Sequence, residues 1–298
     1  MAKNEKNLRS ERRSQFQEVW KRLRKNKLAM VGLVLMVLLI LVAVFAEQIS
    51  PYPYSKQDYN AVFETPSWKH PFGTDEYGRD ILSRVIYGSR ISLRVGFISL
   101  TFGALIGCIV GAVAGFSGGG VDNVIMRICD IFAGIPQTVL AIAIASTLGP
   151  GITSALIAVA VGSIPSFARV VRAATMTVRD MEYVEAAYSL GASKAQIIFS
   201  HIFPNILAPI IVQATLGIAT SILLCASLSF IGLGAQPPLP EWGTMLSNAR
   251  TYMRDYPHMV IAPGLAIMIT VLALNLLGDG LRDALDPKLK RSEPGNGK

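Results

Sequence analysis

Charged side chains are scarce in this 298-residue chain. Asp, Glu, Lys and Arg make up 16% of its residues and hydrophobic types make up 51%, whereas a typical soluble protein has about 25% charged residues. Five stretches contain none of the four charged types, and each approaches or exceeds the roughly 20 residues that cross a bilayer. This pattern excludes a soluble globular enzyme, a disordered protein and a protein that binds nucleic acid through a basic face. The stretches are Leu28–Ala46, Val95–Val121, Ile131–Ala168, Ile206–Leu239 and Met259–Gly278.

Residues suited to catalysis or metal binding are also few. The three cysteines form no CxxC pair, and the three histidines, His70, His201 and His258, lie in predicted loops or at helix ends without an HExxH motif. The GxxxxGK[ST] loop that cradles the phosphates of ATP is missing as well. We therefore expect no metal site, no catalytic residue and no cofactor bound by this chain.

Six membrane-spanning helices are predicted. Ile131–Ala168 is too long for one crossing, and Gly149-Pro150-Gly151 in its middle offers a turn between two spans. The first apolar run has a cleaved signal peptide as its alternative, but it is longer than the usual core of about 7–15 residues, so we interpret it as an anchor. The fold class is thus all-α and polytopic. The predicted spans are residues 28–49, 94–116, 128–148, 152–169, 206–233 and 259–278.

The distribution of Lys and Arg predicts the orientation. If the N-terminus is cytoplasmic, the inner segments together with Arg169 carry 20 basic residues and the outer segments carry 7. This asymmetry satisfies the positive-inside rule and places both termini in the cytoplasm. The inner segments are 1–27, 117–127, 170–205 and 279–298, and the outer segments are 50–93 and 234–258.

The predicted spans hold few polar groups. Gln137, Gln213 and Asn275 are the main amides, and no ionisable residue lies at a span centre, so a proton relay or ion-coupled site has no obvious place. Arg127 and Asp130 are three residues apart and could pair on one helical face. Gly103, Gly107, Gly111 and Gly115 form a stripe that favours close helix packing, either within one subunit or against a second one.

The two outer segments each predict an additional helix. In 50–93, Arg79, Arg84 and Arg90 alternate with apolar residues, which is typical of a helix lying along the membrane surface. In 234–258, apolar residues repeat at helical spacing from Trp242 onward. Trp242 could anchor that helix at the membrane interface.

The inner segment 180–205 predicts a helix, a glycine turn and a second helix. Asp180 is a good N-cap, Gly191 suits the left-handed residue after a helix, and Ser193 with Gln196 forms a capping box. Small residues on one face of the first helix would let a partner surface come close. That face carries Val184, Ala187, Tyr188 and Gly191.

The same segment resembles the EAA loop of binding-protein-dependent ABC importer permeases. Glu185-Ala186-Ala187 is followed after three residues by Gly191 and ends at Pro204, although His201 and Phe203 replace the usual Ile and Leu. Further stretches are similar to the second permease subunit of dipeptide, oligopeptide, glutathione and nickel importers, from about Trp20 to Lys290. They are Phe72–Asp80 with Ser83-Arg84, Arg127–Asp130, Leu228–Gly234, Gln236-Pro237-Pro238 with Glu241-Trp242-Gly243, and Asn275–Asp283 through Asp286-Pro287.

The resemblance implies a type I ABC importer permease fold and a set of partners. A homologous permease would complete a heterodimer, two ABC ATPase subunits would use ATP and Mg, and an extracytoplasmic binding protein would deliver substrate at the cytoplasmic membrane of a bacterium or archaeon. Apart from the lipid bilayer, no other partner is implied, and nucleic acid is not one.

The resemblance also assigns expected roles to individual residues. The expected ATPase-coupling residues are Glu185, Ala186, Ala187, Gly191, Ser193, His201 and Pro204. Expected structural or gating positions are Arg127, Asp130, Asn275 and Asp279, and an expected contact with the binding protein is Glu241 with Trp242.

The resulting hypothesis is a permease subunit that imports di- or oligopeptides and has no ATPase site of its own. Import of glutathione or nickel by the same machinery is the alternative, and an ion-coupled secondary transporter is a second one. A membrane-embedded hydrolase would need a nucleophile with a base or a metal, which the sequence lacks.

The expected organisation begins with a basic segment (1–27), the first span (28–49) and an external loop with an interfacial helix (50–93). A core of five spans follows (94–278), which contains the coupling loop (180–205) and an external loop (234–258). The chain then continues as a cytoplasmic tail (279–298).

Overall fold

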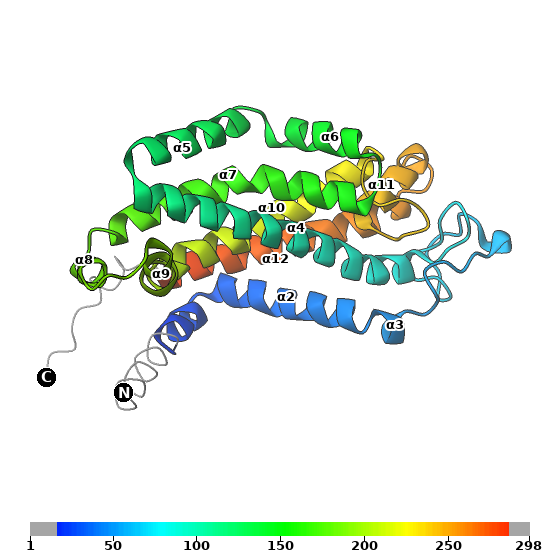
Figure 1. Cartoon of the computed structure of the whole chain (residues 1–298). Coiled ribbons are helices and arrows are strands. Elements are labelled where there is room, and N and C mark those ends of the chain that lie inside the picture. The colour runs from blue at the N-terminus through cyan, green and yellow to red at the C-terminus, as the bar shows by residue number, and fades with distance from the viewer. Residues whose placement is uncertain (1–16, 286–298) are drawn as a thin grey trace, which may run out of the picture.

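The computed structural model describes residues 17–285 as a bundle of long helices (Figure 1). The first part of the predicted basic segment and the end of the predicted tail, residues 1–16 and 286–298, lie outside the described residues. Between them no strand forms, apart from one isolated bridge between Thr74 and Asp80. The long helices are α2 (Lys27–Val44), α4 (Ile81–Ser117), α7 (Ile152–Val178), α10 (Leu207–Phe230) and α12 (His258–Leu285).

Shorter helices complete the bundle at its side and at its two ends. We call the end that carries α8 and α9 the α8 end, and the opposite end, which carries α3, α11 and the loop after α3, the α11 end (Figure 1). The shorter helices are α3 (Ala46–Ile49), α5 (Gly119–Ala133), α6 (Gln137–Leu148), α8 (Glu182–Ser189), α9 (Lys194–Ile197) and α11 (Trp242–Ala249).

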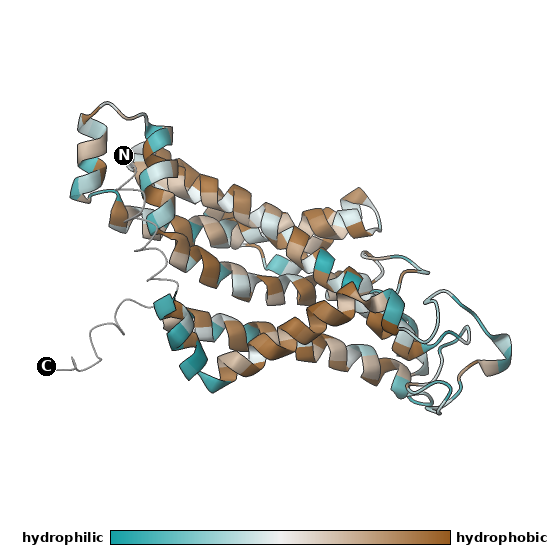
Figure 2. Ribbon diagram, turned by 90° about the horizontal axis from the view of Figure 1, so that it is seen from below, coloured by the Kyte–Doolittle hydropathy of each residue, from teal (hydrophilic) through white to brown (hydrophobic). Residues whose placement is uncertain are grey.

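The helices suffice for the six predicted membrane spans. Five are individually long and apolar enough to cross a membrane, and α5 with α6 forms a sixth span if this bent pair is counted as one. Hydrophobic residues dominate the middle of the bundle, and hydrophilic residues gather in the loops at its ends (Figure 2). The all-helical fold is thereby confirmed, with five candidate spans or six if the bent pair is counted as one.

The third span is broken, although the sequence predicts one helix over 128–148. The α5 and α6 axes differ by 85°, and the break lies at Gly134–Pro136. Pro136 lacks an amide hydrogen and disfavours helical geometry in the residue before it, so the helix ends there and restarts at Gln137. The predicted turn at Gly149–Gly151 is confirmed, since α6 ends at Leu148 and α7 begins at Ile152.

The separate surface helix predicted within 50–93 does not form. Its residues from Ile81 onward are the first turns of α4, which continues without interruption to Ser117. The Asp80 carboxylate caps this helix by accepting the Ser83 amide hydrogen at 2.7 Å, and Arg84 is buried inside the chain instead of lying on a surface. The fourth span is also longer than predicted, because α7 continues past Arg169 to Val178.

The glycine stripe of α4 packs against α7, which confirms the interpretation of packing within one subunit. A Cβ atom on Gly107 would lie 2.6 Å from the Phe167 Cβ, and one on Gly111 would lie 2.4 Å from the Ala168 carbonyl oxygen. The two backbones therefore touch along several turns, as small residues permit in membrane helices. Because this contact fixes the rotation of α7 about its own axis, it also determines which residues of α7 face away from α4.

This contact predicts a difference between two glycine-to-alanine variants. Gly111→Ala forces α4 and α7 apart and should lower the free energy of unfolding by about 1–3 kcal/mol. Gly264→Ala in α12 is the matched control, since a Cβ there meets nothing within 4 Å and alanine is the better helix former. Thermal unfolding in detergent measures both; equal midpoints for the two variants would contradict the close contact.

Candidate functional site

The segment from Met181 to Asn205 forms a compact helical unit at the α8 end (Figure 1). Its first helix begins one residue later than Asp180 would require as a cap. Met181 is the N-cap residue and makes no side-chain capping bond, while the Asp180 carboxylate pairs with the Arg179 guanidinium at 3.1 Å. The predicted role of Asp180 as N-cap is therefore wrong.

The turn after α8 has the predicted left-handed glycine. Gly191 has a φ of +83°, and its amide donates to the Tyr188 carbonyl at 3.0 Å while the Ala192 amide donates to the Ala187 carbonyl at 3.1 Å. This pair of bonds is a Schellman motif, which satisfies the carbonyls at a helix end. The predicted cap of the next helix is also present, because the Ser193 hydroxyl accepts the Gln196 amide hydrogen at 3.3 Å.

Of the four residues on the face of α8 that we expected to meet a partner, Val184 and Ala187 pack inward, whereas Tyr188 and Gly191 are exposed. Val184 and Ala187 are buried in a cluster with Phe167 and Val171 of α7 and with residues of α4, α9 and α10. This cluster, which we call the hinge core, joins α8 to the bundle. The apolar spacing predicts a buried face correctly but cannot say what buries it, and here it is the chain itself.

The outward face of the unit carries large side chains. Tyr188 is 63% exposed and Leu190 is 88% exposed, and Tyr183 is exposed beside them. Glu185 and Ala186 of the EAA sequence are also exposed, whereas Ala187 is buried. Sequence reasoning missed Tyr183 and Leu190, and helical spacing gives no signal for them, because they lie four residues before and three residues after the buried Ala187.

The end of the segment is irregular. A π-helical turn over Ile198–Ile202 is followed by a 3₁₀ turn over Phe203–Asn205, and the Asn205 amide donates to the His201 carbonyl at 2.6 Å. His201 is half-buried and Pro204 is exposed. Of the seven expected coupling residues, only Ala187 is thus fully withdrawn from the surface.

Two adjoining cavities lie on the side of α7 that faces away from α4. One of about 400 Å³ lies between α7 and the break of α5 and α6, and the other, of about 570 Å³, lies between α7, α10 and α12. Val170 lines both, and the Gln213 amide donates to the Ser166 hydroxyl at 2.9 Å where they adjoin. We call their lining the α7 polar face.

The amides singled out in the sequence divide between two places. Gln137 and Gln213 both reach the α7 polar face, whereas Asn275 lies on an exposed side of α12, one turn from the exposed Asp279. Sequence reasoning missed Ser166 and Arg169 as members of this face because it considered the amides within the spans and counted Arg169 only as a basic residue at the end of a span. Ser166 and Arg169 follow Gly162 at spacings of four and three residues, which indicates that all three lie on one face of the helix.

The predicted pairing of Arg127 with Asp130 is not the one that forms. Asp130 pairs with Arg169 of α7 at 3.3 Å, and Arg127 is exposed. A second ion pair joins the same two helices, since the Arg172 guanidinium binds both carboxylate oxygens of Asp122 at 2.5 and 2.6 Å. These two pairs hold α5 along α7, where α5 otherwise buries only Asp122 and Cys129.

Glu241 and Trp242 are buried at the α11 end, at 3% and 1% exposure. The Trp242 indole donates to the Val85 carbonyl at 3.0 Å, and the Glu241 carboxylate caps α11 through the Thr244 amide and accepts the Ser92 hydroxyl at 3.1 Å. Their side chains are therefore used inside the chain. Direct contact with an external protein, expected from sequence, is not available to them, and Trp242 is no interfacial anchor.

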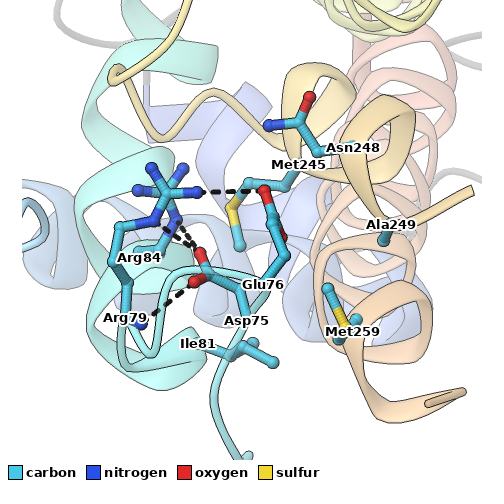
Figure 3. Close-up of a pocket in the computed structure, with 9 residues that line it drawn as sticks. All are labelled: Asp75, Glu76, Arg79, Ile81, Arg84, Met245, Asn248, Ala249 and Met259. Atoms are coloured by element: carbon cyan, nitrogen blue, oxygen red, sulfur yellow. Dashed lines mark hydrogen bonds and ion pairs between the residues drawn. The ribbon is translucent and has the colours of Figure 1, made fainter. Parts of the chain in front are cut away.

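A buried ionic cluster lies next to this helix (Figure 3). The Arg79 guanidinium binds Asp75 at 2.6 Å and Glu76 at 3.2 Å, and Arg84 lies 3.4 Å from the same Asp75 carboxylate. Asp75 also accepts the backbone amide hydrogens of Tyr77 and Arg79, each at 2.9 Å. The cluster fixes the loop before α4 to the first turns of that helix.

The two carboxylates of the cluster differ in their electrostatic setting. Burial, and then the neighbouring Asp75 charge, raise the pKa of Glu76 above its ordinary value. Asp75 instead lies between two guanidinium groups and accepts two amide hydrogens. Sequence reasoning assigned Arg79 and Arg84 to a surface because it could not foresee these partners.

Solved structures with a similar architecture identify the fold. The chain matches an inward-facing structure of the MetNI methionine ABC transporter with a TM-score of 0.58 and 21% identity, over 69% of this chain and 98% of that one. An amino acid ABC transporter matches with a TM-score of 0.52 and 19% identity, over 68% and 94%. The fold is that of an ABC importer permease.

Two protein-family models match the sequence. The model for the binding-protein-dependent transport system inner membrane component matches residues 103–291, and the model for the N-terminal TM domain of oligopeptide transport permease C matches residues 14–66. The chain belongs to the family of binding-protein-dependent transport system inner membrane components. It is an integral membrane protein and a transport permease.

Curated relatives cover nearly the whole chain. A dipeptide transport system permease protein from Alkalihalophilus pseudofirmus is 48% identical over 93% of this chain and 91% of its own length. A glutathione transport system permease protein from Escherichia coli O157:H7 is 49% identical over 93% of this chain and 92% of its own length. The resemblance inferred from the EAA segment and the other motifs is thereby confirmed.

The ionic cluster predicts that neutralising its two carboxylates has unequal effects on the free energy of unfolding. Asp75→Asn leaves two buried guanidinium groups short of negative charge and should lower the free energy of unfolding by about 3–5 kcal/mol. Glu76→Gln removes a charge that burial already disfavours and should change it by no more than about 1 kcal/mol. Thermal unfolding in detergent measures both, and a Glu76→Gln loss as large as that of Asp75→Asn would refute this division of roles.

Proposed function

We propose that this chain is the permease subunit of an ABC importer that moves di- or oligopeptides across the cytoplasmic membrane of a bacterium or archaeon. In this proposal a homologous permease completes a heterodimer, two ABC ATPase subunits bind ATP and Mg, and an external binding protein delivers the substrate. The chain itself has no ATPase site. The observation that carries the proposal is the exposed α8 unit, anchored by the hinge core to both α4 and α7.

The outward face of α8 suits a cleft in an ATPase subunit. Tyr188 and Leu190 project from a short helix, and exposed aromatic residues are frequent anchors in protein interfaces. Glu182 and Glu185 lie in the first turn of α8 and add negative charge to the contact. Glu185 is our choice for a polar anchor, with Ala186 allowing close approach and Gly191, Ser193, His201 and Pro204 shaping the turn and the end of the unit.

The packing behind α8 explains how force would reach the membrane. Val184 and Ala187 contact the same cluster as Phe167 and Val171, so displacement of α8 is transmitted directly to α7. A ligand shifts a conformational equilibrium only through contacts that differ between states. ATP-driven closure of the ATPase subunits would provide that difference at α8.

The proposed orientation follows from charge. With the α8 end in the cytoplasm, the basic residues concentrate on the inner side, both termini are cytoplasmic, and the loops at the α11 end face the binding protein. In this arrangement Asn275 and Asp279 lie on the exposed side of α12, where contact with the second permease gives them a structural or gating role. Arg127 is exposed and Asp130 pairs with Arg169 across α5 and α7.

The substrate class rests on the curated relatives. One is named for dipeptide transport and another for glutathione transport. Glutathione is a modified tripeptide, so both names describe small peptides, and glutathione import is the second candidate. An ion-coupled secondary transporter is disfavoured, because ABC importer folds use separate ATPase subunits. Nickel import by the same machinery is the remaining alternative.

Reconstitution tests the proposal directly. The chain, co-expressed with its neighbouring permease and ATPase genes, should co-purify with both in mild detergent and import labelled dipeptides into liposomes only with ATP and the binding protein. Parallel arms with glutathione and chelated nickel define the substrate class. Recovery of this chain alone as an active, ATP-independent transporter would overturn the assignment.

The turn at Gly191 provides a sharper test of coupling. Gly191→Val should reduce transport and binding-protein-stimulated ATPase activity several-fold, because a β-branched residue resists positive φ. Gly191→Asn is the control, since asparagine tolerates this conformation better and no neighbour lies within 4 Å of a Cβ there. If the valine variant retains wild-type transport and ATPase stimulation, the turn has no role in coupling.

A further inference from the structure

The polar groups on the α7 polar face would be unfavourable if this face contacted lipid. Ser166 and Arg169 are exposed on α7, which is one of the helices able to span the membrane, and Gln213 reaches them from α10. Polar and ionisable side chains at membrane depth almost always face a water-filled cavity or another protein, because lipid solvates them poorly. Ser166 lies within the predicted fourth span and Arg169 at its inner end, so this side of the chain suits a water-filled passage or a protein partner better than lipid.

The polar groups that line the two cavities are mainly hydrogen-bond donors and amides. They include the guanidinium groups of Arg169 and Arg282 and the amides of Gln137, Gln213 and Asn205. Among the described residues that line the cavities, no carboxylate is present. A lining of this kind is suited to a ligand that carries carboxylate and amide groups, and it offers a bare divalent cation no carboxylate to offset its charge.

Arg169 retains donors for such a ligand. Within residues 17–285 its ion pair is a single contact with Asp130 at 3.3 Å, between two side chains that are each about half exposed, and exposed pairs of this kind are weak. A guanidinium has five N–H donors in a planar fork that matches a carboxylate. The remaining donors can therefore bind a second carboxylate while Asp130 stays in place.

The neighbouring groups are arranged around Arg169. Ser166 lies one turn before it on the same face of α7, and the Gln213 amide holds the Ser166 hydroxyl at 2.9 Å. The break between α5 and α6, just before Gln137, leaves space beside these groups. Gly162 preserves that space, because a Cβ at Gly162 would lie 3.1 Å from the Gln137 side chain. The larger cavity then continues toward Asn205 and Ile206 at the end of the α8 unit.

We propose that Arg169, together with Ser166 and Gln213, forms a subsite that holds the carboxylate of a substrate on its way through the permease. This inference rests on the proposed function and narrows its substrate class to molecules with a free carboxylate and amide groups, as in peptides and glutathione, and disfavours a bare metal cation. Because the cavity reaches Asn205, an occupant of the passage also contacts the segment that moves with α8.

Transport by the reconstituted complex is the first test. With saturating loaded binding protein, Arg169→Gln should lower dipeptide import about tenfold, the value of one lost charged contact, while binding-protein-stimulated ATPase activity is retained. Arg169→Lys should keep part of the rate because it keeps the charge. Asp130→Asn is the control, since it breaks the ion pair and leaves the guanidinium in the cavity.

The outcomes separate the subsite from a structural role. If Asp130→Asn and Arg169→Gln lower import equally, Arg169 acts only through its ion pair and the subsite is refuted. Wild-type import by Arg169→Gln refutes it as well. If the wild-type complex imports no peptide at all, the proposed function fails instead, and the next measurement still reports on the subsite.

Thiol labelling tests the charge of the cavity without any substrate. In a Ser166→Cys complex, anionic sulfonatoethyl methanethiosulfonate should react faster than cationic aminoethyl methanethiosulfonate, and adding Arg169→Gln should lower that rate ratio several-fold. The three native cysteines are buried, and the complex with Ser166 intact gives the background. Faster reaction of the cationic reagent while Arg169 is present would refute an anion-binding cavity.

Discussion

The backbone contact between α4 and α7 is the constraint on which the rest of the structure depends. Four glycines of α4, spaced four residues apart, remove the side chains that would hold the two helices apart, and Phe167, Ala168 and Arg172 of α7 occupy the space. In a bilayer, where apolar burial does not drive helices together, this close fit supplies the attraction through packing. It fixes the rotation of α7 and thus decides which residues face α4 and which face the cavities.

Two functional surfaces follow from that rotation. Phe167 and Val171 form the hinge core that receives α8, and Ser166 and Arg169, on the neighbouring side of the same turns, face the cavities. The coupling unit and the α7 polar face are therefore parts of one packed body. In the proposed function the membrane portion needs little chemistry of its own, because a shift of α8 would displace the cavity wall through the hinge core.

Much of this fold can be predicted from periodicity, and the exceptions have physical causes. The five long apolar helices, the glycine stripe and the left-handed Gly191 depend on local sequence and agree with the structure. The burial of Trp242 and Arg84 does not, because they have partners far away in the chain: the Val85 carbonyl for Trp242 and the Pro238 carbonyl for Arg84. Similarly, Asp130 finds Arg169, not the nearby Arg127, since α5 lies along α7 in a way that no local pattern specifies.

The central claim is that α8, α4 and α7 move as one body during the transport cycle. Spin labels on Ser189→Cys of α8 and Thr101→Cys of α4, both exposed positions, measure their separation by electron paramagnetic resonance in the reconstituted complex with and without trapped ATP. The account predicts an unchanged distance within this chain, while the distance from Ser189→Cys to a label on the second permease changes. A change in the Ser189–Thr101 distance on ATP binding would contradict it.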